Sequence, residues 1–206
     1  MALTENFLII TFTMSSAEGS AIAGIFWSYS PVVVITSELE GKINGQVAVT
    51  VVTSSIVGSV PRLIVGIWKG NYTHSFIYNS KKLNIHLLKN DQFDLVKNFG
   101  FYTGRERDKF DSISFKPGSN GCPVIDGVHS YMECEVLNAM DGGDMTPFLV
   151  KVSEGKVFDS GSWMTLSDFY NYAPPDWIAE YDQKLSKSIQ FSMPIIHNIN
   201  YEPFKT

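Results

Sequence analysis

The sequence predicts a single all-β-rich domain with a few short helices. Val, Ile, Thr and aromatic residues dominate short segments separated by Gly, Asn, Asp and Pro, which is typical of many short strands. With 206 residues and 44% apolar composition, the chain can bury one substantial core, whereas two domains would both be small. We therefore expect one domain over 1–206, with a core at about 25–165 and a C-terminal extension at about 166–206.

Six segments have the composition of strands. In the second of them apolar residues occur on both alternating faces, so we expect both faces to be covered, as in a barrel wall. In the fifth, Glu133 and Glu135 fall on one side of the strand, so that side is predicted to be solvated. The six segments are 31–36, 46–53, 63–68, 83–88, 130–137 and 148–152.

Three short helices are expected between or before the strands. Thr73 is a candidate cap for a helix through about Asn79, and 92–99 carries apolar residues at helical spacing. Ser15 begins a capping-box pattern ahead of a third helix at 21–27. The last forty residues are expected to form an irregular tail whose aromatic side chains pack on the barrel or on a second subunit.

Charge and composition argue against several classes of protein. The 16 basic and 21 acidic residues give a net charge of −5, and no basic run is present to bind a nucleic-acid backbone. We find no apolar stretch near the roughly 20 residues that a membrane-spanning helix needs, and no cationic start of a signal peptide. We therefore expect no nucleic acid and no membrane as partners, and a cytoplasmic protein.

Metal and nucleophile motifs are also missing from the sequence. Cys122 and Cys134 are too few and wrongly spaced for a zinc or redox pair, and the four histidines show no metal-ligand spacing. We predict ordinary buried or half-buried thiols and no bound metal. The chain has no Walker, Rossmann or nucleophile-elbow pattern, which disfavours nucleotide hydrolases, dinucleotide dehydrogenases and α/β-hydrolases.

An ordered series of segments resembles the FMN-binding flavin reductase-like family, above all its flavoredoxin-type and diflavin-associated members. The resemblance covers about 30–170 and implies a six-stranded Greek-key split β-barrel that dimerises with the flavin near the subunit boundary. The segments are Ile35–Ser37, Ile43–Ala48 running on to Thr53–Ser55, Pro61–Val65, Lys69–His74, Asn98–Arg105 with Asp108–Phe110, Gly121–Val124, Tyr131–Glu135 and Gly143–Phe148.

The cofactor implied by the resemblance is FMN. Hydroxyls and amides at a strand end, and a cation and an amide before a helix N-terminus, both suit a phosphate, although the strand end is also compatible with an ordinary polar terminus. Small residues on one strand would let the isoalloxazine ring approach its backbone. The implied phosphate residues are Thr53, Ser54, Ser55, Lys69, Asn71, Thr73 and His74, and the implied ring residues are Asn44, Gln46, Val47, Ala48, Val49, Thr50, Phe101, Thr103, Gly104 and Arg105.

Arg105 has two interpretations. By resemblance it reaches a phosphate or ribityl oxygen of the flavin. Alternatively, Arg105, Arg107 and Asp108 form a solvated ion-pair cluster on a loop. The sequence allows both.

Three residues depart from the family pattern beside the flavin. Val49 stands where a polar residue is usual, Trp68 where Asn is common, and Met145 where many relatives carry a His near the nicotinamide. The turn between Ser55 and Pro61 is also about two residues longer than usual. We expect loss of the His to affect FMN binding little and to disfavour efficient reduction by NAD(P)H.

The leading hypothesis is an FMN-dependent NAD(P)H:flavin oxidoreductase that passes electrons to free flavin, iron or a protein acceptor. It needs no protein nucleophile, because the cofactor supplies the chemistry. The second hypothesis is a flavoredoxin-like carrier with little NAD(P)H activity, and the third is a barrel that has lost its cofactor. Preference for NADH or NADPH, the final acceptor and the choice between FMN and FAD stay open.

Overall fold

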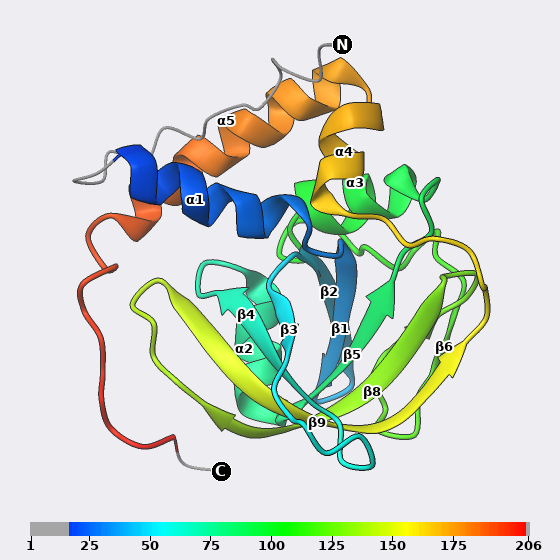
Figure 1. Ribbon diagram of the computed structural model, residues 1–206. Helices are drawn as coiled ribbons and strands as arrows, with labels where there is room; N and C mark the ends of the chain where they lie inside the picture. Colours follow the sequence, from blue (N-terminus) through cyan, green and yellow to red (C-terminus); the bar gives the residue numbers. More distant parts are fainter. Residues whose placement is uncertain (1–16, 205–206) are drawn as a thin grey trace.

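The computed structural model describes residues 17–204 and confirms the all-β-rich fold (Figure 1). Seven antiparallel strands form one curled sheet in the order β2-β1-β5-β8-β9-β4-β3, and β6 and β7 form a separate ribbon. The strands are β1 (Val33–Leu39), β2 (Lys42–Ala48), β3 (Val51–Thr53), β4 (Arg62–Trp68), β5 (Lys82–Leu87), β6 (Phe115–Pro117), β7 (Pro123–Ile125), β8 (Ser130–Ala139) and β9 (Met145–Val157).

The sheet curls into a barrel because its two edge strands are consecutive in the chain. β2 lies at one edge and β3 at the other, yet only Val49 and Thr50 separate them. Two residues span less than about 8 Å, so the edges must approach each other. Thr50 then accepts a hydrogen bond from the Gly66 amide of β4 at 2.9 Å. β2 and β3 are continuous in the chain at the point where the two edges meet, so they count as one strand. On this count the seven strands form the predicted six-stranded split barrel.

β-branched and aromatic side chains from neighbouring strands fill the barrel. Ile35, Val65, Ile85 and Phe148 are fully buried in one cluster. These residues lie on strands that the sequence predicted from the same β-branched and aromatic composition. The core therefore fixes the sheet that carries the site.

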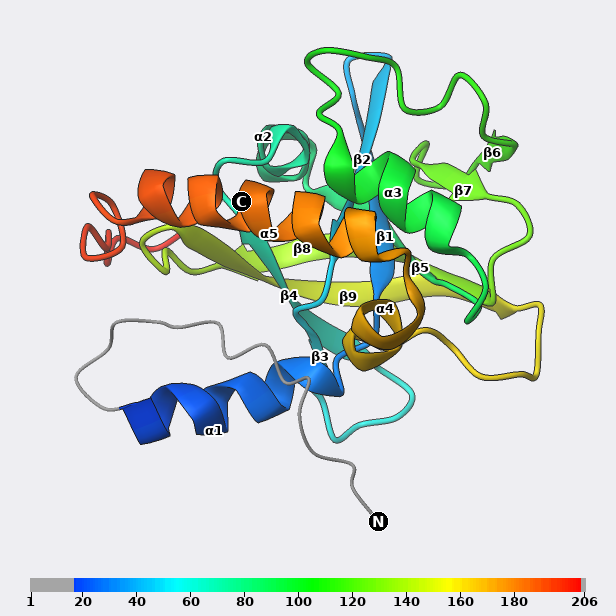
Figure 2. The same ribbon diagram turned by 90° about the horizontal axis from the view of Figure 1, so that it is seen from above.

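In the described part of the chain five helices surround the barrel, and Figures 1 and 2 both place α5 beside α3. α2 packs on β1 and β2, and α3 packs on β2. Within 17–204 no helix combines the length and apolar character needed to cross a membrane. The helices are α1 (Ala17–Ser28), α2 (Tyr72–Ser80), α3 (Phe93–Phe101), α4 (Leu166–Tyr172) and α5 (Pro175–Ser192).

Three local predictions are wrong. The predicted strand 46–53 is interrupted at 49–50, and Val52 beyond the break is 54% exposed. Thr73 lies inside α2 instead of capping it, since Asn71 holds the N-cap position. Glu133 is 2% exposed, because amides and a hydroxyl of the loop before β7 bind its carboxylate. Ser15 lies outside the described residues.

The prediction of an irregular C-terminal tail is also wrong. Thr165 and Asp168 form a reciprocal capping box at the start of α4. Pro175 occupies the first turn of α5, where the missing amide of proline costs nothing. The extension does pack on the barrel, which is one of the two expected arrangements, since Phe169 is buried and the rings of Tyr181 and Phe101 lie 6.0 Å apart between centroids.

Candidate functional site

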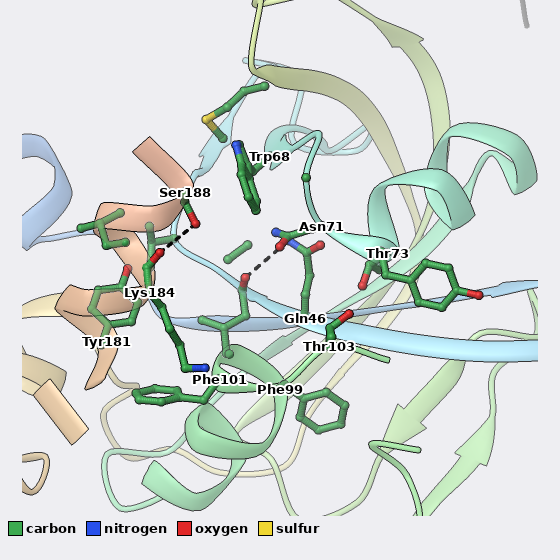
Figure 3. Close-up of a pocket in the computed structure, with 18 of the residues that line it drawn as sticks. Gln46, Trp68, Asn71, Thr73, Phe99, Phe101, Thr103, Tyr181, Lys184 and Ser188 are labelled. Atoms are coloured by element: carbon green, nitrogen blue, oxygen red, sulfur yellow. Dashed lines mark hydrogen bonds between the residues drawn. The ribbon is translucent and has the colours of Figure 1, made fainter. Parts of the chain in front are cut away.

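A cavity of about 1100 Å³ opens between β2, the loop after β4, the end of α3 and α5 (Figure 3). The structure brings twelve of the predicted site residues together around it, although their role in binding a cofactor stays a prediction. They are Asn44, Gln46, Val47, Ala48, Val49, Thr50, Asn71, Thr73, Phe101, Thr103, Gly104 and Arg105.

Close backbone approach holds the end of α3 against β2. A Cβ at Gly45 would lie 2.9 Å from the ring of Phe99, and a Cβ at Gly104 would lie 2.3 Å from Oδ1 of Asn44. Both distances are shorter than real Cβ contacts. A larger residue at either position would displace Phe99 or the Asn44 side chain, so these glycines let β2 and the α3 end pack closely.

Gln46 has the buried side-chain oxygen that lacks a partner. The residue is 5% exposed and lines the cavity. Its Nε2 donates a long 3.4 Å hydrogen bond to the Val47 carbonyl. Its Oε1 has no hydrogen-bond partner, and no other buried nitrogen or oxygen lacks one among the side chains that the structure describes. Leaving such an acceptor unpaired costs about 1–3 kcal/mol. Terminal amides rotate broadly, so a donor held in the cavity can satisfy this oxygen.

The other end of the cavity is polar and carries a cation. Asn44 Nδ2 donates to Thr73 Oγ1 at 3.0 Å, which fixes the first turn of α2 beside β2. The side chain of Asn71 makes no capping hydrogen bond to that helix. Arg105 Nη1 donates to the Gly70 carbonyl at 3.3 Å, and its guanidinium lies 4.8 Å from the centre of the Tyr72 ring.

The alternative of an ion-pair cluster around Arg105 is not supported. Arg107 donates to Oδ1 of Asn98 and stacks over Tyr102. The carboxylate of Asp108 accepts from the Phe110 amide at 2.8 Å. None of the ion pairs in the described chain joins Arg105 or Arg107 to Asp108. Among the described residues, Arg105 therefore has no ion-pair partner and lines the cavity.

Five predicted phosphate residues lie outside the cavity lining. Thr53, Ser54 and Ser55 follow β3 down to the β3–β4 loop, where the Ser55 hydroxyl bonds to the backbone two residues on. Lys69 Nζ forms an ion pair with Asp141 at 2.5 Å. His74 Nε2 lies 2.8 Å from the Thr146 hydroxyl, and burial, with the charge of Lys69, lowers its pKa.

A family model described as the flavin reductase-like domain matches residues 28–171. The chain belongs to this family. Its matched segment includes every predicted cofactor residue, from Asn44 to Arg105. The family domain thus supplies β2, the loop after β4 and the α3 end of the cavity.

Several relatives are similar to the chain in sequence. The high molecular weight rubredoxin of Moorella thermoacetica is 33% identical over 66% of this chain, and the match spans 60% of that protein. The ferric-chelate reductase (NAD(P)H) of Archaeoglobus fulgidus is 26% identical over 66% of this chain and 81% of its own length.

Solved structures share the fold of the flavin reductase-like domain. An NADH:FAD oxidoreductase of Streptomyces globisporus aligns with a TM-score of 0.66 at 20% identity, over 76% of this chain and 93% of its own. A flavoredoxin of Methanosarcina acetivorans aligns with a TM-score of 0.59 at 19% identity, over 63% of this chain and 69% of its own. These likenesses confirm the predicted split-barrel class.

Two of the three departures from the family pattern are neighbours at the cavity. Trp68 on β4 lies opposite Met145 on β9 in the antiparallel register, and both side chains line the cavity. The third, Val49, lies at the break between β2 and β3 and also lines it. All three therefore alter the surface that a bound ligand meets.

Sequence reasoning missed Lys109, a buried amine in the wall. The residue is 5% exposed, and its Nζ donates to the Gly45 carbonyl at 2.8 Å and to the Phe99 carbonyl at 2.9 Å. Burial, with the charge of Arg107, lowers the pKa of Lys109 to about 8. The amine clamps the α3 end to β2, and its only signal in the sequence was its place beside Asp108.

The cavity residues of the C-terminal extension were also missed. They come from one face of α5 and the turn after it, outside the flavin reductase-like domain. They were missed because this segment was predicted to be irregular, whereas it forms α5. They are Tyr181, Lys184, Leu185, Ser188, Ile189, Ser192, Met193, Ile196 and His197.

Proposed function

We propose that the chain binds FMN in this cavity and passes electrons from NAD(P)H through it to free flavin, iron or a protein acceptor. The observation that carries the proposal is Gln46 Oε1, an unpaired buried acceptor in the wall of the cavity. An isoalloxazine ring has a polar pyrimidine edge and an apolar body, and this wall offers Gln46 and backbone groups next to apolar side chains. The residues present therefore fit a flavin.

The phosphate end of FMN is proposed to lie beside Arg105 and the start of α2. Arg105 carries a full positive charge at the cavity, and its own hydrogen bond goes to the Gly70 carbonyl and not to a carboxylate. Asn71 and Thr73 add an amide, a hydroxyl and a helix N-terminus, groups that favour an anion. This choice favours FMN over FAD because FMN ends in the phosphate, whereas FAD continues into a second nucleotide.

The chain's own residues position the cofactor and exclude water. When bound, FMN accepts two electrons as hydride from a reduced nicotinamide and returns them to an acceptor. Gln46 orients the polar edge, and the apolar side chains of Val47 and Phe101 keep water from the ring. Lys109 holds both halves of the wall in place. None of these roles needs a nucleophile.

A carrier with little NAD(P)H activity is the second candidate. Val49 replaces a polar residue beside the flavin and Met145 a histidine near the nicotinamide, as the family resemblance implies, and both lie at the cavity. In this case electrons would come from a redox protein. The relative in Moorella thermoacetica, a high molecular weight rubredoxin, makes such a donor reasonable.

Anaerobic reduction separates the two candidates. The purified protein loaded with FMN is mixed with NADH or NADPH, and the loss of the visible absorbance of oxidised flavin is followed. Rapid bleaching supports the oxidoreductase, and slow bleaching that a reduced rubredoxin accelerates supports the carrier. A colourless protein after incubation with FMN contradicts both.

A homodimer is the proposed assembly, and the cytoplasm the proposed location. Apolar side chains stand exposed at two places: Ile25 and Phe26 on α1, and Val52, Ile56 and Val57 at and after β3. Such surface is costly in a monomer and typical of an interface. Light scattering at micromolar concentration should give twice the 23.0 kDa chain mass, and a monomer mass would contradict the dimer.

A further inference from the structure

Helix α5 lines the cavity although it lies outside the flavin reductase-like domain. The domain ends at residue 171, and α5 spans Pro175–Ser192. Its lining residues recur at intervals of three and four, which places them on one face of the helix. They are Tyr181, Lys184, Leu185, Ser188, Ile189 and Ser192.

After Tyr181, which packs against the core cluster around Phe101 and Phe169, this face of α5 borders the cavity. No residue of α5 is buried, whereas α2 and α3 each bury several. Leu185 and Ile189 are half-buried and border the open cavity. In Figure 3, Lys184 reaches from the helix toward Phe101 across this space. The apolar stripe formed by Leu185 and Ile189 would therefore be covered by a ligand that fills the cavity.

The first half of α5 is fastened to α3. Lys97 of α3 forms an ion pair with Glu180. The same ammonium lies 4.3 Å from the ring centre of Phe101 and 4.9 Å from that of Trp177. Phe101 also contacts Tyr181. An ion pair and a cluster of rings thus set the distance between the helix and the α3 end of the wall.

The last turn of α5 is fastened to β4 through Trp68. The indole Nε1 donates to Ser192 Oγ at 2.9 Å, and the indole meets Phe191 edge to face at 5.3 Å. The indole lies directly over Gly70, where a Cβ would be 2.2 Å from the ring. The residue that departs from the family pattern on β4 is therefore the residue that binds α5.

We propose that α5 is the second wall of the flavin site, and that Trp68 and Ser192 are the positioning residues that hold it over the outer face of the bound flavin. The inference rests on the proposed function. Bound FMN then lies between β2 and the α5 stripe, and its contacts with α5 slow its release. The second reactant must also fit beside Leu185 and Ile189.

The test measures FMN release from the full-length protein. Ser192→Ala removes the acceptor and Trp68→Phe removes the donor while keeping an aromatic ring. Released FMN is captured by an excess of another FMN-binding apoprotein, and its dissociation rate is followed by fluorescence. Each variant should release FMN about five-fold faster, the effect expected of one neutral hydrogen bond.

Matched controls separate positioning from general damage to the helix. Ser186→Ala changes an exposed serine on the other face, whose hydroxyl bonds only to the Asp182 carbonyl of the same helix. It should release FMN at the wild-type rate, and so should Ser192→Thr, which keeps the acceptor oxygen. The double variant of Trp68→Phe and Ser192→Ala should be no faster than either single change, because both remove the same bond.

The outcomes of this test distinguish a failure of the α5 proposal from a failure of the proposed function. If wild-type protein binds no FMN, the proposed function fails and the second wall fails with it. If FMN binds but Ser192→Ala and Trp68→Phe release it at the wild-type rate, only the wall is overturned. Additive effects in the double variant would likewise show that the two residues do not act through their shared hydrogen bond.

Discussion

Replacing Gln46 by Met should stabilise the flavin-free protein and weaken its binding of FMN. Met matches the length of Gln but carries no strong hydrogen-bonding group. In the flavin-free protein, Gln46 Oε1 is buried without a partner, and its Nε2 makes one 3.4 Å hydrogen bond. An unpaired buried acceptor costs about 1–3 kcal/mol, more than so long a bond returns. The flavin-free variant should therefore gain about 1 kcal/mol.

The magnitude translates into two measurements. A gain of about 1 kcal/mol raises the unfolding temperature of a chain of this size by about 2–4 °C. The lost hydrogen bond to FMN is worth about 1 kcal/mol, or about a five-fold weaker Kd. Thermal unfolding without FMN gives the first quantity, and calorimetric titration with FMN gives the second.

Gln92→Met is the matched control for Gln46. Oε1 of Gln92 accepts from the Lys89 amide at 2.9 Å, and its Nε2 donates to the Gly127 carbonyl at 3.0 Å. This change should therefore destabilise the protein and leave FMN affinity unchanged. The reasoning is refuted if Gln46→Met lowers the unfolding temperature like the control while its FMN affinity stays at the wild-type value.

Three further predictions concern charge and the reacting face. Arg105→Ala should weaken FMN binding, more so at low salt, and spare riboflavin, because it deletes the cation that is proposed to lie beside the phosphate; equal affinity of the wild-type protein for FMN and riboflavin would oppose this. Met145→His should raise the rate of FMN reduction by NAD(P)H several-fold with FMN affinity unchanged; loss of flavin instead would remove Met145 from the nicotinamide side. Burial lowers the pKa of His86 to about 4, and the Ile125 amide donates to its Nε2, so the unfolded chain binds the proton more tightly. Stability is then complete above about pH 6.5 and should fall by about 3 kcal/mol toward pH 4, and urea unfolding that is equally stable at pH 7 and pH 5 would contradict it.

Strand composition was sufficient to predict most of the barrel, but it could not show which faces are covered. The strands around Ile35 and Phe148 were predicted because β-branched and aromatic residues suit a pleated, buried surface. Glu133 was predicted to face solvent because charged residues usually do. Its carboxylate instead accepts from the Ser119 hydroxyl at 2.6 Å and from the Asn120 amide at 3.1 Å. A loop from elsewhere in the chain satisfies it, and alternation within one strand carries no information about that loop.

The family resemblance predicted the β2 side of the cavity, but it could not predict α5. The resemblance ends near residue 170, so the extension had to be interpreted from its own residues. The extension is predicted to be irregular, although Pro175 is favourable in the first turn of a helix. Tyr181, Leu185 and Ile189 follow at helical spacing. The signal was present, but a helix with a half-open apolar face has a weak periodic pattern.

The identity of residue 68 can be understood only together with α5. An indole at this position needs a glycine two residues later, since a Cβ at Gly70 would lie within 2.2 Å of its ring. Its N–H also needs an acceptor in a partly buried place, and Ser192 supplies one. An asparagine at position 68 would be too short to reach Ser192 as the indole does. We infer that Trp68 and α5 depend on each other through these contacts. Relatives whose cavity lacks this helix are therefore expected to carry the family's usual residue at position 68.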